Sequence, residues 1–153
     1  MNTVIDQYGQ ILLEAMGQTL LLALYGLLFA CILGLIFGML SVVKNKVCNV
    51  IAYIFVYAIR GVPMIVLAFF IFFGVPYLFN TIFEGLFAEK ITLTALQAGT
   101  ACLALNCGAY MSEIIRAGIQ SVDRGQMEAA RSLGMTYWRS MFKVVLPQAI
   151  RTM

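Results

Sequence analysis

Histidine is absent from this sequence, and charged residues are scarce. Lys, Arg, Asp and Glu make up 11% of the 153 residues, whereas a soluble domain carries about 25%. Without histidine, the chain lacks the most common general base of enzymes and the most common metal ligand. Hydrophobic residues reach 62%. The composition therefore excludes an ordinary soluble domain and indicates a membrane protein.

Other marks of enzymatic chemistry are also missing. The phosphate-binding pattern G-x-x-x-x-G-K-[S/T] does not occur, because the pair Gly34 and Gly38 lies in an apolar run without the lysine. The cysteines form no C-x-x-C pair, and we interpret them as small buried residues; they are Cys31, Cys48, Cys102 and Cys107. We expect no catalytic residue, no metal and no cofactor, so energy for any active process would come from a partner chain.

Three stretches with little or no charge predict transmembrane helices, because about 20 apolar residues cross a bilayer. They cover residues 19–43, 58–80 and 91–112. The apolar run 47–59 is either the start of the second span, kinked near Pro63, or a helix in the membrane interface, and Pro63 also suits a fresh helix start. We expect an all-α, multi-pass membrane protein with one transmembrane domain over 1–153 and a cytoplasmic loop over 113–150.

Basic residues predict the orientation of the spans. Lys44, Lys46 and Arg60 flank the first loop, whereas only Lys90 falls between spans two and three. The C-terminal segment holds Arg116, Arg124, Arg131, Arg139, Lys143 and Arg151. Because cytoplasmic loops are enriched in Lys and Arg, the N-terminus is predicted to lie outside and the C-terminal loop in the cytoplasm. Orientation alone explains the positive charge, so no nucleic-acid partner is expected.

The first span carries small residues at four-residue spacing: Gly26, Ala30, Gly34 and Gly38. Small residues on one helix face allow close packing of helices in lipid. The pattern favours a packing seam, which could lie between subunits. The alternative is that glycine is simply common in membrane helices.

The third span is the most polar. Asn106, Tyr110 and Glu113 fall on one helix face. Polar groups at membrane depth usually face protein or a water-filled cavity. This face either borders a translocation path or forms hydrogen bonds between helices, with Glu113 at the cytoplasmic edge.

The charged C-terminal loop predicts two short helices. Asp123 followed by Gln126 resembles a capping box, which places a helix start near Arg124. Gly134 would end that helix in a left-handed conformation, and Thr136 could cap a second helix. Periodicity alone favours an amphipathic helix at the membrane interface.

One motif in this loop resembles the signature of bacterial ABC importer permeases. That signature reads E-A-A, three residues, G, nine residues, I, one residue, L-P. The residues at these positions here are Glu128, Ala129, Ala130, Gly134, Val144, Leu146 and Pro147, and the one change is Val144 in place of Ile. Two further stretches resemble the polar amino-acid uptake branch: residues 60–63 with 73–76, and residues 109–119. The resemblance covers the chain from the first span onward.

The resemblance implies a permease subunit that couples to ATP hydrolysis in another chain. It identifies Glu128, Ala129, Ala130, Gly134, Leu146 and Pro147 as the residues that dock a cytoplasmic ATPase subunit. It also implies a second permease subunit, an external solute-binding protein and a location in the bacterial inner membrane. The alternatives are a small structural subunit of another membrane complex or an inactive truncated permease.

The sequence departs from that branch at three places. Val62 stands where the branch usually has Thr, and Leu67 where it usually has Gln. Both changes weaken the expectation of a strongly polar substrate. Family members also have about two more spans after the loop, so we expect this chain to be truncated at its C-terminus.

Overall fold

All regular secondary structure in the described part of the chain is helical, as predicted. The computed structural model describes residues 2–43, 45–83 and 90–152, so that Lys44 of the orientation argument lies outside it. The elements in chain order are α1 (Asn2–Val42), α2 (Lys46–Gly61), α3 (Met64–Phe69), the π-helix η1 (Phe70–Gly74), α4 (Val75–Ile82), α5 (Ala95–Ser121), α6 (Arg124–Ser132), α7 (Tyr137–Ser140), the π-helix η2 (Met141–Val145) and α8 (Leu146–Thr152).

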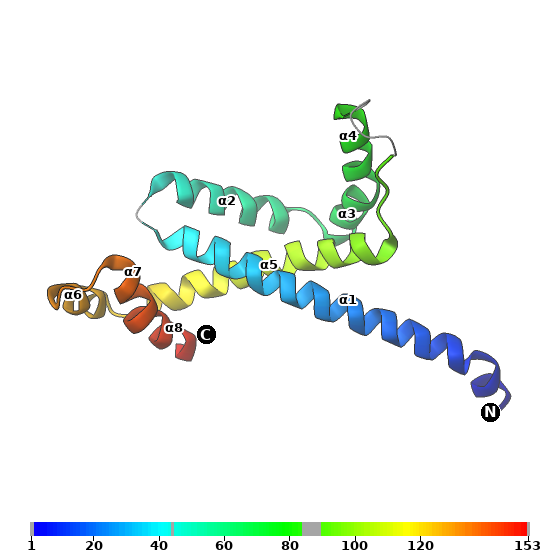
Figure 1. Cartoon of the computed structure of the whole chain (residues 1–153), viewed down its shortest axis with the longest axis horizontal. Helices are drawn as coiled ribbons and strands as arrows, with labels where there is room; N and C mark the ends of the chain where they lie inside the picture. The colour runs from blue at the N-terminus through cyan, green and yellow to red at the C-terminus, as the bar shows by residue number, and fades with distance from the viewer. Residues whose placement is uncertain (1, 44, 84–89, 153) are drawn as a thin grey trace.

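The two longest helices, α1 and α5, lie side by side and run in the same direction (Figure 1). The seam of small residues on α1 is the face that packs against α5, because a Cβ added at its glycines would meet α5 side chains. The pairs are Gly26 with Leu103, Gly34 with Met111, and Gly38 with Ile115. The difference in residue number is the same in all three pairs, as expected for two parallel helices in register. These glycines therefore face α5 of the same chain.

Helix α2 folds back along α1 and α5 (Figure 1). Ala52 and Val56 are buried on its inner face, and the rings of Phe55 and Phe37 stack with centroids 3.8 Å apart. The side-chain amide of Asn49 faces the end of α1, and the orientation that satisfies its neighbours directs Nδ2 to the carbonyl oxygens of Leu40 (2.9 Å), Ser41 (3.2 Å) and Val43 (2.9 Å). Asn49 thus satisfies carbonyl groups that a helix end leaves without a partner.

A break at Val62–Pro63 separates α2 from the apolar helix that follows. Proline disfavours the helical conformation in the residue before it, and Val62 is extended, with φ −105° and ψ 133°. The predicted span 58–80 is therefore wrong at its start, because the helix begins at Met64. The prediction that Arg60 flanks the first loop is also wrong. At 1.5 Å per residue, Arg60 lies about 20 Å along α2 from Lys46, at the end of the helix away from that loop.

Each π-helix ends two residues before a proline. The Val75 amide donates to the Phe70 carbonyl before Pro76, and the Leu146 amide donates to the Met141 carbonyl before Pro147. Proline has no N–H, and its ring clashes with the carbonyl four residues earlier. A wider turn moves that carbonyl aside, which allows both helical runs to continue past their prolines.

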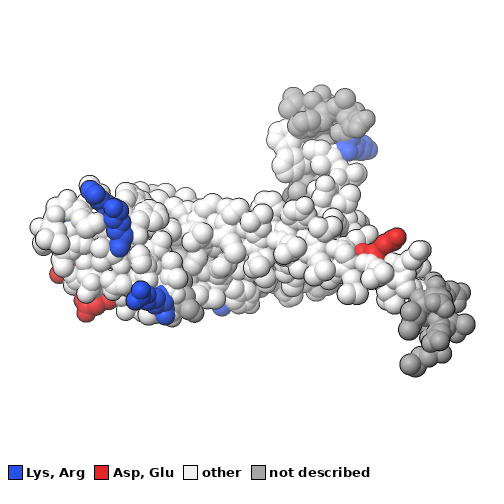
Figure 2. All heavy atoms as spheres, turned by 60° about the horizontal axis from the view of Figure 1, so that its bottom comes forward, with Lys and Arg blue, Asp and Glu red and all other residues white. Residues whose placement is uncertain are grey.

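Within the described residues, two stretches of helix are long and apolar enough to cross a membrane: Tyr8–Val42 and Met64–Ile82. The second stretch packs on the start of α5 through Leu67 and Ile71. The third predicted span, 91–112, falls mostly on α5 and stays a prediction. Figure 2 shows that the visible charged side chains gather mainly at the end formed by α6–α8, while the middle of the molecule is almost bare of charge.

Candidate functional site

The loop that carries the E-A-A motif begins with a capped helix. The Asp123 carboxylate accepts a hydrogen bond from the Gly125 amide at 2.6 Å, so Asp123 is the N-cap of α6 as predicted. The expected capping box does not form, because the Gln126 side chain points elsewhere. Its Oε1 accepts a hydrogen bond from Gln148 Nε2 at 3.2 Å, which ties α6 to α8 instead.

Gly134 ends α6 in the left-handed conformation that the sequence predicts. It has φ 81°, the only positive φ among the described residues. The Gly134 amide donates to the Arg131 carbonyl at 3.0 Å, and the Met135 amide donates to the Ala130 carbonyl at 3.3 Å. This pair of hydrogen bonds is the Schellman arrangement. The backbone at the tip of the loop is thereby fixed on both sides of the turn.

The motif residues divide into an outer and an inner group. Glu128, Ala129 and Pro147 are exposed. Ala130 is buried, and Leu146 packs against the loop's own hydrophobic cluster. The outer residues of α6 are available to a partner chain, whereas the inner residues hold the helix in place.

A hydrophobic cluster attaches the loop to α5. Ile115 and Ile119 of α5 pack against Met141, Val145 and Ala149 of the loop, and all five are buried. A force on α6 can therefore pass into α5 through close-packed side chains, which transmit strain because protein interiors have low compressibility.

Tyr137 provides a second attachment, to the end of α1. Its hydroxyl donates to the Val42 carbonyl at 3.4 Å. Burial raises the pKa of Tyr137 above its usual value, because a buried site disfavours the charged phenolate. The loop thus contacts both members of the parallel helix pair.

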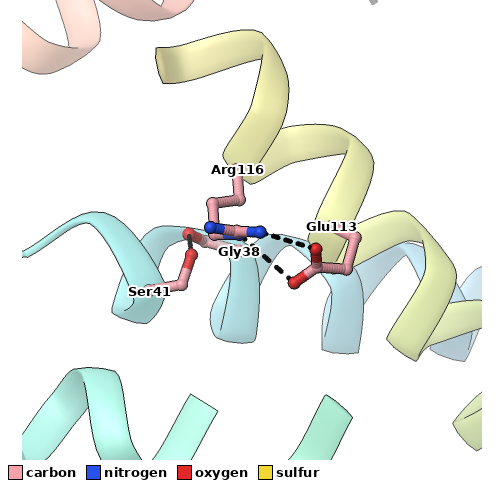
Figure 3. Close-up of polar contacts among 4 residues, drawn as sticks. All are labelled: Gly38, Ser41, Glu113 and Arg116. Atoms are coloured by element: carbon pink, nitrogen blue, oxygen red, sulfur yellow. Dashed lines mark hydrogen bonds and ion pairs between the residues drawn. The ribbon is translucent and has the colours of Figure 1, made fainter. Parts of the chain in front are cut away.

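The polar residues of α5 meet α2 and each other. The Arg60 guanidinium lies 4.7 Å from the centre of the Tyr110 ring. Glu113 accepts two hydrogen bonds from Arg116, at 3.2 Å and 2.8 Å. Figure 3 shows this ion pair beside the turn of α1 that holds Gly38 and Ser41. The predicted path residues Tyr110 and Glu113 therefore have partners within the chain, and Asn106 is half-buried.

Sequence reasoning did not single out Leu133, which precedes Gly134. Its side chain is 85% exposed, although the loop lies outside the apolar stretches. The signal was available, because the motif leaves this position free and a large hydrophobic residue stands there directly before the helix-ending glycine.

Comparison with known proteins identifies several similar membrane proteins. The sequence profile of the family described as binding-protein-dependent transport system inner membrane component matches residues 15–153. The chain is 39% identical over 117 residues to the nopaline transport system permease protein NocM of Agrobacterium fabrum, with 74% of this chain and 46% of that protein covered. It is 43% identical over 98 residues to the L-cystine transport system permease protein TcyB of Bacillus subtilis, with 64% and 37% covered.

A solved structure is similar over almost the whole chain. It is the crystal structure of an amino acid ABC transporter with histidines, in which one chain has a TM-score of 0.76 and 34% sequence identity. The match covers 97% of this chain and 64% of that chain. The chain spans less than half the length of the two curated permeases.

Proposed function

Because the chain belongs to the family of binding-protein-dependent transport system inner membrane components, we propose that it is a permease subunit of an ATP-driven amino-acid importer. The observation that carries the proposal is the E-A-A loop: a nine-residue polar helix, fixed at both ends and presenting Glu128 and Ala129 to the surroundings. The named relatives, a nopaline permease and a cystine permease, support an amino-acid-like substrate.

In this function, α6 docks on a cytoplasmic ATPase subunit and transmits its movement to the membrane helices. The buried cluster of Ile115, Ile119 and Met141 links the loop to α5, and the seam of small residues links α5 to α1. When two ATPase subunits close on ATP, α6 moves as a rigid element and tilts the α1–α5 pair. Coupling of this kind needs a packed element with two discrete arrangements.

The proposal includes an orientation of the chain in the membrane. Since α1 and α5 run in parallel, their C-terminal ends emerge on one side, together with the loop α6–α8 (Figure 1). With the basic loop in the cytoplasm, the N-terminus lies outside. The partners are then a cytoplasmic ATPase subunit, a second permease subunit and an external solute-binding protein.

The translocation path borders the face of α5 that carries Asn106, Tyr110 and Glu113. Support comes from the contact of Arg60 with Tyr110, because charged groups within membrane segments face protein or water rather than lipid. Substitution of Asn106 by Leu should reduce uptake while leaving the bound ATPase subunit in place.

The central test is charge reversal on the docking helix. Glu128→Lys in the assembled importer should abolish co-purification of the ATPase subunit and ATP-driven uptake, while membrane insertion stays intact. Glu128→Gln removes the charge without reversing it and should have a smaller effect. Lys90→Glu serves as the control, because Lys90 is exposed in the loop on the opposite side. Normal uptake by Glu128→Lys would show that the docking assignment is wrong.

A further inference from the structure

The helical run after α6 carries an exposed face of aromatic and basic side chains, which we call the aromatic–basic face. It consists of Trp138, Arg139, Phe142 and Lys143, all of which are exposed. The rings of Trp138 and Phe142 lie with their centroids 6.1 Å apart. Met141 and Val145 of the same run are buried in the cluster with α5. The aromatic–basic face is therefore not part of the loop's own core.

This face begins where a membrane-spanning stretch ends. Tyr137, directly before Trp138, donates from its hydroxyl to the Val42 carbonyl at 3.4 Å. Val42 is the last residue of Tyr8–Val42, which is long and apolar enough to cross a membrane. Helix α7 lies beside this end of α1 (Figure 1). The polar headgroup layer borders the hydrocarbon core at such an end, so α7 lies at the level of that layer.

A hollow of about 190 Å³ lies beside the same end of α1. It is lined by Val43, Arg131, Tyr137 and Trp138. The Arg131 guanidinium can pair with a phosphate group through two parallel hydrogen bonds. Val43 and the two aromatic rings offer an apolar wall to the carbon atoms that follow such a phosphate. This combination matches the junction between the phosphate and the acyl chains of a phospholipid.

The charges of this region are of one sign. Residues 129–152 contain no Asp or Glu, and their four basic residues are Arg131, Arg139, Lys143 and Arg151. Within the described residues, neither Arg139 nor Lys143 has an acidic partner, since the ion pair found there joins Arg116 to Glu113. Basic side chains at a membrane surface attract anionic lipids, and the charge of this face is available for them.

We propose that the aromatic–basic face binds anionic phospholipid in the membrane leaflet at the C-terminal end of α1, which is the cytoplasmic leaflet in the orientation proposed above. Trp138 and Phe142 insert among the first carbon atoms of the acyl chains, while Arg139 and Lys143 pair with phosphate groups. Arg131, at the hollow, holds the phosphate of the lipid nearest to α1. This binding does not require α6 to dock on a partner chain.

An acidic protein surface fits this face less well than lipid does. Tryptophan is enriched at membrane–water interfaces, whereas lysine is depleted at protein–protein interfaces, so Trp138 and Lys143 together favour lipid. Lipid is also the neighbour that this end of α1 already has, because Leu35 and Ile36 are exposed on an apolar helix.

Trp138 provides the readout, because it is the single tryptophan of the chain. The full chain is placed in nanodiscs of neutral phosphatidylcholine that contain a small, equal fraction of either brominated phosphatidylcholine or brominated phosphatidylglycerol. Bromine quenches tryptophan fluorescence only at close contact, so quenching reports how often each lipid adjoins Trp138. The anionic lipid should quench more strongly than the neutral one. High salt should reduce this preference, because it screens exposed charges.

Arg139→Gln combined with Lys143→Gln should remove most of the preference, because each basic side chain near the surface contributes a factor of about five. Quenching by the neutral lipid should persist, since Trp138 still lies at the membrane. Lys90→Gln is the matched control: Lys90 is also basic and exposed, but it precedes α5, whereas the aromatic–basic face follows that helix. It should keep the wild-type preference. All these side chains are exposed, so the melting temperature should not change.

Two kinds of result would overturn the assignment. If both lipids quench the wild-type chain equally, or if the preference survives in the double variant, the face does not select anionic lipid. If neither lipid quenches Trp138, the face is turned away from the bilayer and is open to a protein partner instead. Neither result bears on the docking of α6, which Glu128→Lys tests separately.

Discussion

The guanidinium group of Arg60 lies over the ring of Tyr110, at 4.7 Å from its centre. A second contact joins the same two helices with the roles exchanged: Arg116 of α5 lies 5.7 Å from the ring centre of Tyr53 on α2. Each helix thus supplies one cation and one aromatic ring. These two contacts hold α2 against α5. The contact with the Tyr110 ring also stabilises the positive charge of Arg60, which lies at the end of α2 far from the first loop.

The contribution of the Tyr110 ring can be measured by two substitutions. Tyr110→Leu removes the ring and should lower the free energy of unfolding by about 0.5–2 kcal/mol, the range for a cation over an aromatic face. Tyr110→Phe keeps the ring and should lower the free energy of unfolding by much less than Tyr110→Leu does. Thermal unfolding in detergent provides the readout. Equal losses in both variants would assign the effect to the hydroxyl group and contradict the ring contact.

The close approach of α1 and α5 depends on Gly34. A Cβ at this position would lie 2.7 Å from the Cβ of Met111, so Gly34→Ala must separate the helices. Overpacking of this kind costs about 1–3 kcal/mol, and the melting temperature should fall accordingly.

Gly17, on the same helix, supplies the matched control. A Cβ there would meet nothing within 4 Å, and Gly17→Ala should leave stability unchanged or raise it by up to about 1 kcal/mol, because alanine favours helix. If Gly34→Ala is as well tolerated as Gly17→Ala, the seam contributes no close packing.

Local features of this fold could be predicted from the sequence. Asp123 and Gly134 mark the ends of α6 because N-caps and left-handed helix ends depend on a few neighbouring residues. The seam that includes Gly34 follows from helical periodicity alone. The docking motif was found by resemblance, and its residues lie on α6, in the turn at Gly134, in η2 and at the start of α8.

Features that depend on distant parts of the chain could not be predicted. Gln126 had an adequate local partner in Asp123, yet it pairs with Gln148, which the fold brings near. From the sequence, Arg60 counts among the residues that flank the first loop. In the fold, α2 runs back along α5, and this places Arg60 over the ring of Tyr110. The exposure of Leu133 could not be predicted from sequence periodicity either, because exposure depends on how all the helices pack together.

The turn at Gly134 can be tested without changing any side-chain contact. A Cβ at Gly134 would meet nothing within 4 Å, but φ is 81°, so Gly134→Ala costs only backbone strain of about 1–2 kcal/mol. We expect the end of α6 to fray and ATPase binding to weaken. Gly61→Ala is the control, because Gly61 is equally open and has no positive φ. Equal behaviour of the two variants would contradict the role of the left-handed turn.

The attachment of the loop through Tyr137 should depend on pH. Burial raises the pKa of Tyr137 above the ordinary value of 10.0, so the unfolded chain releases this proton before the folded chain does. The contribution of Tyr137 to stability is therefore fully present below about pH 10 and is lost as the pH rises through the folded pKa. Trp138, the single tryptophan, has its ring centroid 5.6 Å from that of Tyr137, and its fluorescence reports the change. Tyr137→Phe should remove the alkaline step, and a step that persists in that variant would assign it to another group.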